Sequence, residues 1–197
     1  MISSVISKVV IYNEDLAKIK RYRLLMSDNS PFNRPKNEKK LTANDRMRNT
    51  KKRLKDMILC NDFEHFFTLT IDSNKCSRVD IEDSWSIIKG HFKQCKKANK
   101  DFKYIIVAEY HGDNQSIHYH GVMYGYPFPI SGTSISFFNS HLGFSNISKI
   151  KDKQRVSSYI LKYITKDMVP IGGCYYSSSR NMRRPVVLDA YLDDVYS

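Results

Sequence analysis

Two short apolar segments separated by a turn constrain the fold of this chain more than any other feature. Residues 102–111 read FKYIIVAEYH, residues 117–126 read IHYHGVMYGY, and GDNQS between them has turn composition. β-Branched and aromatic residues favour strands, so the pattern predicts a β-hairpin over 102–126. Because a hairpin joins antiparallel strands, the sheet built around it is expected to be antiparallel.

The other elements are expected to surround this hairpin. Segments 65–72 (HFFTLTID) and 144–150 (FSNISKI) have strand composition, whereas 79–100 and 151–168 carry apolar residues at helical spacing. Helix formers from Thr42 onward predict a basic helix that enters the core. This mixture predicts an α+β fold, with a central antiparallel sheet and flanking helices that pack on one of its faces.

A length of 197 residues suits one domain. We expect an N-terminal segment, 1–60, beside a core of 61–197. Within the first segment, residues 1–33 predict a strand and a loop. The aromatic and basic tail from residue 172 is expected to add a strand or to pack along the core.

The charge balance points to a polyanionic partner. The chain has 32 Lys and Arg against 20 Asp and Glu, a formal charge of +12, and residues 34–55 (RPKNEKKLTANDRMRNTKKRLK) are especially basic. This stretch is either a solvated face or a nucleic-acid contact. The residues expected to contact DNA phosphate are Lys51, Lys52, Arg53, Arg180, Arg183 and Arg184.

Other sequence features exclude several classes of protein. The four cysteines form no C-x-x-C pair, which indicates reduced thiols rather than a zinc or redox motif. We find no signal-peptide layout, no apolar run of about 18 residues and no P-loop motif. We therefore expect a cytoplasmic protein that does not contact a membrane and is not an ATPase of the P-loop type.

The hairpin carries a candidate metal site. His118 and His120 are two residues apart on a strand, so both imidazoles point to one face. Glu109 and His111 share a face of the preceding strand, and a four-residue connection, Asp113–Ser116, would place Glu109 opposite His120. Glu109 is the preferred third ligand, with His111 as an alternative or orienting group. The set suits Mn²⁺ or Mg²⁺, although structural histidines are the competing interpretation.

The segment SSYILKYITKD carries a candidate nucleophile. Tyr159, Lys162, Tyr163 and Lys166 fall on one helical arc, opposite an apolar arc. Lysine charge favours a phenolate, and a phenolate that attacks phosphorus forms a phosphotyrosine. Tyr159 is the preferred nucleophile, and Tyr163 is either a second nucleophile or a structural residue. An ordinary solvated face is the alternative.

Three motifs in this order, FFTLTID, EYHGDNQSIHYHGVMYG and YILKYITK, resemble the HUH endonucleases that initiate rolling-circle replication. The resemblance is strongest to the replication-associated proteins of small single-stranded DNA phages and related plasmids, of the microvirus and filamentous-phage kind. It implies a sheet similar to an RNA-recognition fold. It also implies nicking of single-stranded origin DNA through a 5′-phosphotyrosine, with metal ligands at His118, His120 and Glu109.

The resemblance further implies the partners, namely single-stranded or hairpin origin DNA, a host helicase and a polymerase. An HUH single-strand transposase or relaxase would share the chemistry, but the motif order and the two tyrosines favour replication. A non-catalytic nucleic-acid-binding module with an aromatic sheet is the alternative from another class. The oligomeric state is not indicated by the sequence.

Overall fold

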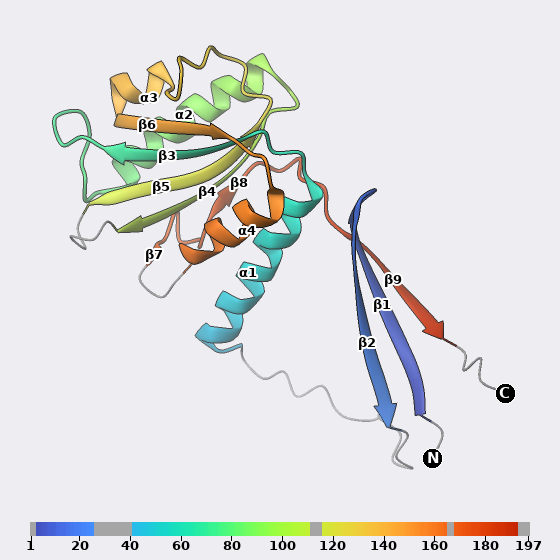
Figure 1. The fold of residues 1–197 in the computed structure, drawn as a ribbon. Helices are drawn as coiled ribbons and strands as arrows, with labels where there is room; N and C mark the ends of the chain where they lie inside the picture. Colours follow the sequence, from blue (N-terminus) through green and yellow to red (C-terminus); the bar gives the residue numbers. More distant parts are fainter. Residues whose placement is uncertain (1–2, 26–40, 111–115, 165–167, 193–197) are drawn as a thin grey trace.

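The computed structural model describes residues 3–25, 41–110, 116–164 and 168–192, and contains two antiparallel sheets (Figure 1). The larger is a six-stranded core sheet in the order β6-β3-β5-β4-β7, with β8 also paired to β4. Its strands are β3 (His65–Ile71), β4 (Lys103–Tyr110), β5 (Ile117–Tyr124), β6 (Gly143–Lys149), β7 (Met168–Val169) and β8 (Ser177–Ser178). The predicted β4–β5 hairpin therefore lies inside the sheet, and the predicted α+β fold is confirmed.

Helices cover both faces of the core sheet, whereas we expected them on one face. Figure 1 shows α2 and α3 on one side and α1 and α4 on the other. Ile106 and Ala108 of β4 lie in the apolar cluster with α2, and Ile105 and Val107 lie in the cluster with α1 and α4. Four consecutive apolar residues signal a strand buried on both faces. The helices are α1 (Ala43–Cys60), α2 (Ile81–Ala98), α3 (Ser136–His141) and α4 (Lys153–Lys162).

Capping residues set where the two helices on the α4 side begin. Thr42 precedes α1 and accepts a hydrogen bond from the Asp45 amide at 3.1 Å, while the Asp45 carboxylate accepts one from the Thr42 amide at 3.2 Å. This reciprocal capping box satisfies two amides that helical bonding leaves unpaired. Asp152 caps α4 in a simpler way, by accepting from the amides of Gln154 and Arg155.

Helix α4 is shorter than the predicted 151–168. It ends at Lys162, and the amide of the next residue, Tyr163, donates to the carbonyls of Ile160 and Leu161. The chain then returns to the core sheet, where Met168 begins β7 and pairs with β4. Apolar spacing alone continues through Met168, so it could not mark this change from helix to strand.

The second sheet, here called the arm, joins the two ends of the chain. It contains β1 (Ser3–Asn13), β2 (Leu16–Leu25) and β9 (Val186–Leu192) in the order β2-β1-β9. Figure 1 shows it beside α1, extending away from the core sheet. The N-terminal region thus has two strands rather than the predicted strand and loop. The tail adds strands to both sheets.

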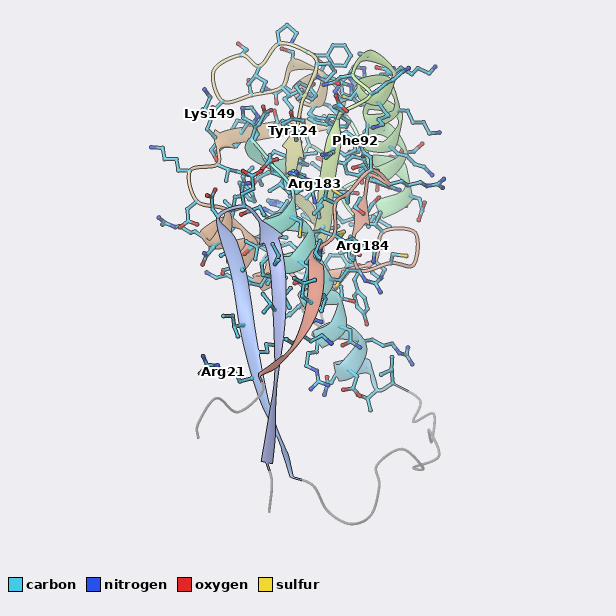
Figure 2. The ribbon with its side chains drawn as sticks, turned by 90° about the vertical axis from the view of Figure 1, so that its right-hand side faces the viewer. Arg21, Phe92, Tyr124, Lys149, Arg183 and Arg184 are labelled. Atoms are coloured by element: carbon cyan, nitrogen blue, oxygen red, sulfur yellow. The ribbon has the colours of Figure 1, made fainter. Side chains whose placement is uncertain are left out.

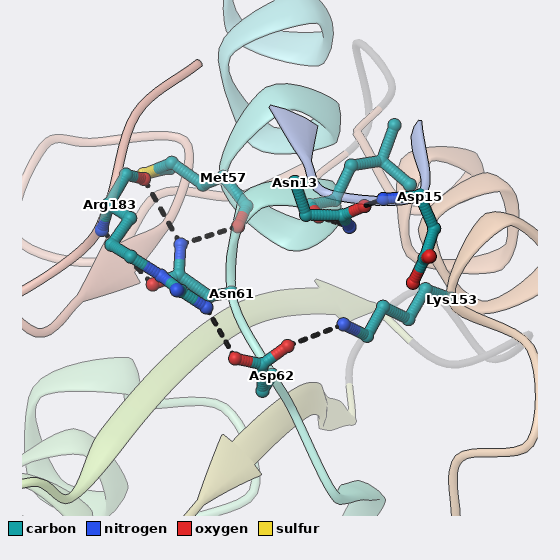
Figure 3. A network of polar contacts seen from close by, with 8 residues as sticks. Asn13, Asp15, Met57, Asn61, Asp62, Lys153 and Arg183 are labelled. Carbon is teal, nitrogen blue, oxygen red and sulfur yellow. Dashed lines mark hydrogen bonds and ion pairs between the residues drawn. The ribbon is translucent and has the colours of Figure 1, made fainter. Parts of the chain in front are cut away.

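A polar network fixes the tail to the end of α1 before it enters the arm (Figure 3). The Asn61 amide donates to the carbonyls of Met57 at 2.8 Å and Arg183 at 3.1 Å, and its oxygen accepts from the Arg183 amide at 3.0 Å. The Asp62 carboxylate pairs with Lys153 at 2.6 Å and with the Arg183 guanidinium. The hydrogen bond from Lys153 and the charges of both cations lower the pKa of Asp62.

Two expectations about the chain as a whole can be compared with the structure. Cys60, Cys76 and Cys95 are buried, Cys174 is exposed, and all four are free thiols, as predicted. Within the part of the chain that the structure describes, no helix has the length and apolar character needed to cross a bilayer.

Candidate active site

The β4–β5 hairpin places Glu109, His118 and His120 on the sheet face that α4 covers. The register pairs Glu109 with His118 and Val107 with His120, whereas we expected Glu109 opposite His120. The connection runs from 111 to 116, longer than the four residues assumed. Because side chains alternate with a period of two, this two-residue shift leaves all three side chains on the predicted face.

His120 is the centre of the site. It is buried, its Nε2 lies 2.8 Å from Oε1 of Glu109, and its Nδ1 lies 3.2 Å from the hydroxyl of Thr68 on β3. Burial, together with the charge of His118, lowers the pKa of His120 to about 3. The ring is therefore neutral at pH 7, and its contact with Glu109 is a hydrogen bond rather than an ion pair.

The two neighbours of His120 determine its tautomer. A carboxylate only accepts hydrogen bonds, so Nε2 carries the proton toward Glu109, and Nδ1 accepts from the Thr68 hydroxyl. A hydroxyl can also accept. If Nε2 bound a metal ion, the proton would move to Nδ1, and Thr68 could accept it. Thr68 thus holds the ring in one orientation in either state.

The two tyrosines of the α4 segment lie against His120. Tyr163 stacks on it, with ring centroids 3.8 Å apart and parallel planes. Tyr159 meets Tyr163 edge to face at 5.2 Å and Phe66 of β3 at 5.3 Å. Tyr163 is half-buried, as predicted, whereas Tyr159 is 42% exposed. A nucleophile must be reached by DNA, so this exposure favours Tyr159.

Charge and burial act differently on the two phenols. Burial, the hydrogen bond with Tyr159 and the nearby carboxylate of Glu109 all raise the pKa of Tyr163. Lys162 places its ammonium group 5.6 Å from the centroid of the Tyr159 ring. The positive charge is therefore beside Tyr159, and the negative charge beside Tyr163. Lys166 and His111 lie outside the described residues.

The donor atoms fit a divalent ion in part. Among the residues described, no three His, Cys, Asp or Glu side chains form a preformed metal cluster. Glu109 and His120 instead provide two adjacent donors, one carboxylate and one neutral imidazole, and His118 lies half-buried across from Glu109. Such a set fits Mn²⁺ or Mg²⁺ in an open site that water and a phosphate complete.

Comparison with known families identifies the chain. A family model for the replication-associated protein ORF2 matches residues 64–168, more than half of its length. The chain belongs to this family. No match was found among curated proteins or among solved structures. The expected membership in a family of replication initiators is thereby confirmed, and the role of the chain lies in replication.

The family match contains the whole candidate site and little else. It begins just before β3 and ends at Met168, so it excludes the arm and α1. Sequence reasoning assigned no role to Thr68 or Phe66, although both lie in the first of the three motifs. Their positions alternate along β3, and the pairing of Thr68 with His120 places them on the histidine face. That alternation was the available signal.

The basic residues predicted to contact DNA lie in three places. Lys52, Arg53 and Arg184 line one cavity of about 400 Å³ between α1 and the start of the arm, and Lys51 is half-buried nearby on α1. Figure 2 shows Arg183 and Arg184 where the tail passes toward β9.

The other two predicted residues have different surroundings. Arg180 lines a separate cavity beside α2, with Lys89 and Lys93. Arg183 belongs to the Asp62 network, so part of its charge is already neutralised.

Proposed function

We propose that this replication-associated protein nicks single-stranded or hairpin origin DNA and thereby initiates rolling-circle replication. The observation that carries the proposal is the continuous contact from Glu109 through His120 and Tyr163 to Tyr159. A carboxylate, an imidazole and an exposed phenol gathered on one sheet face suit phosphoryl transfer to tyrosine. The family match favours replication over transposition or conjugative relaxation.

In the proposed reaction, the Tyr159 hydroxyl oxygen attacks the scissile phosphorus. An oxygen–phosphorus bond forms to Tyr159, and the bond from phosphorus to the 3′ oxygen breaks. The phenol loses one proton and the departing 3′ oxygen gains one, so no water is consumed. The 3′ hydroxyl can prime synthesis by a host polymerase, behind a host helicase. The reverse transfer, from Tyr159 to a 3′ hydroxyl, rejoins the ends.

The surrounding residues have distinct proposed roles. Lys162, and Lys166 by the sequence pattern, stabilise negative charge on the attacking phenol. Glu109, His120 and His118 would hold Mn²⁺ or Mg²⁺, with His111 as the alternative ligand. When bound, the ion would polarise the scissile phosphate. Tyr163 keeps the His120 ring in place by stacking, and remains the candidate for a second nucleophile.

The direct test is adduct formation. Single strands tiled across the replicon that encodes this chain would carry a label at the 3′ end, because the proposed adduct retains the downstream fragment. We expect one strand to give a labelled protein band on a denaturing gel with Mn²⁺, and no band with EDTA. If no strand in the set gave an adduct, the enzymatic proposal would fail and the non-catalytic binding module would take its place.

Thr68 offers a test of the imidazole geometry. Thr68→Val keeps the shape of the side chain but removes the hydroxyl next to Nδ1 of His120. We expect Mn²⁺ affinity, measured by calorimetry, to fall about 10- to 100-fold, the usual effect of losing such a partner. Thr68→Ser should restore most of it. Equal affinity in all three proteins would contradict the proposed role.

The cavity next to α1 predicts a salt-dependent interaction with DNA. Lys52→Glu with Arg53→Glu should weaken binding and reduce the slope of log affinity against log salt by about 0.7 for each phosphate that the variant no longer neutralises on single strands. Fluorescence anisotropy at several salt concentrations measures both. Lys97→Glu with Lys100→Glu, at exposed positions at the end of α2, is the charge-matched control. An unchanged slope in the first variant would rule out this interaction.

A further inference from the structure

A second cavity adjoins the first where the arm meets α1. It has a volume of about 310 Å³ and is lined by residues from β1, β2, α1 and the first turn of α4. Lys52 and Asp56 line both cavities, so the two are neighbours along one surface. The cationic residues of this surface, here called the arm groove, are Lys18, Lys20, Lys52, Arg53, Lys55 and Arg184.

The arm groove carries a large excess of positive charge. Among the described residues that line it, Asp56 is the one carboxylate, and the Tyr12 side chain is hydrogen-bonded to it. Lys18, Lys52 and Arg184 are all exposed. Cations from β2, α1 and the tail converge here, although they are far apart in sequence. Such a cluster attracts a polyanion, and its exposed members can be reached from solvent.

The lining also limits what part of a nucleic acid could bind. Tyr12 is the one aromatic residue among the described residues around the groove, and it is half-buried with its hydroxyl engaged by Asp56. Without an exposed ring, the groove cannot stack bases as single-strand platforms do. Lysine and arginine side chains would contact phosphate oxygens, which position DNA without reading its sequence.

We propose that the arm groove binds the phosphate backbone of DNA that flanks the nicked phosphate. This inference rests on the proposed function. Gln154 of α4 lines the groove, and Tyr159 lies five residues later on the same helix, about 7.5 Å along its axis. One DNA strand can therefore reach both places. The arm and α1 lie outside the family match, so the groove is an addition to the nicking core.

The test uses charge reversal on the arm, in the full chain. Lys18→Glu with Lys20→Glu is compared with Lys97→Glu with Lys100→Glu on α2, and thermal unfolding checks the fold of each. The probes are a labelled mixed-sequence single strand and its duplex, titrated at several salt concentrations. We expect affinity for DNA to fall about tenfold at low salt in the arm variant, and the salt slope to fall by about 1.4 on the single strand and about 1.8 on the duplex. The control variant should bind as wild type does.

Two results would overturn the inference. In the first, the arm variant keeps the wild-type affinity and slope. In the second, the control variant is weakened as much as the arm variant, which would indicate a nonspecific effect of net charge. The adduct assay on the wild type separates this inference from the proposed function. An adduct together with unchanged binding by the arm variant rejects the groove alone, whereas the absence of any adduct rejects the nicking activity.

Discussion

Replacing Tyr159 with phenylalanine is expected to reduce the covalent protein–DNA adduct to background. The substitution removes the attacking oxygen but keeps the ring, and with it the edge contacts to Tyr163 and Phe66. Because no other group can form the same bond at that place, the loss should be close to complete rather than partial. A denaturing gel with 3′-labelled DNA measures it, and mass spectrometry of the wild-type adduct identifies the modified peptide.

Tyr163→Phe is the matched control. It preserves the stack on His120 and removes only the hydroxyl that bonds Tyr159. We expect the adduct to form about fivefold more slowly, which corresponds to one hydrogen bond of about 1 kcal/mol. If Tyr163→Phe abolished the adduct while Tyr159→Phe retained it, the nucleophile would be Tyr163. Partial adduct in both single variants and none in the double variant would indicate two working nucleophiles.

Glu109→Gln should uncouple the protein from its metal ion. The amide has the size of the carboxylate and can still contact Nε2 of His120, but it lacks the negative charge that attracts Mn²⁺ or Mg²⁺. Loss of a partner behind a ligand costs about 10- to 100-fold in affinity, and we expect loss of the ligand itself to exceed this. Calorimetry measures Mn²⁺ binding, and adduct yield against Mn²⁺ concentration measures the effect on nicking.

The result for Glu109→Gln has a clear opposite. Wild-type affinity for Mn²⁺ in this variant would exclude Glu109 as a ligand and leave His118 and His120 to be tested in the same way. Thermal unfolding should stay close to wild type, since Glu109 is only half-buried and its contact survives in the amide. A large fall in stability would instead show that the carboxylate has a structural role.

The sequence predicted most local structure because local structure follows periodicity. The hairpin, the strand over 65–71 and helices α1 and α2 appear near their expected places. The face shared by Glu109, His118 and His120 was also predictable, since it depends only on alternation. The register was wrong by two residues, because the composition of a turn does not give its length.

Several features depended on contacts between distant segments. The apolar spacing that predicted a helix through residue 168 did not reveal that Met168 would pair with β4. The weak alternation of the N-terminal region did not reveal that β1 would find β9.

The sequence by itself determined which side chains share a face, because 3.6-residue and two-residue periods are properties of the chain alone. Only the tertiary structure decided which faces meet. It placed Tyr163 flat on His120, gave Thr68 a place beside the same ring, and brought Lys52 next to Arg184. The physical reason is that such contacts depend on how helices and strands pack and pair, and no spacing within one element encodes its partner.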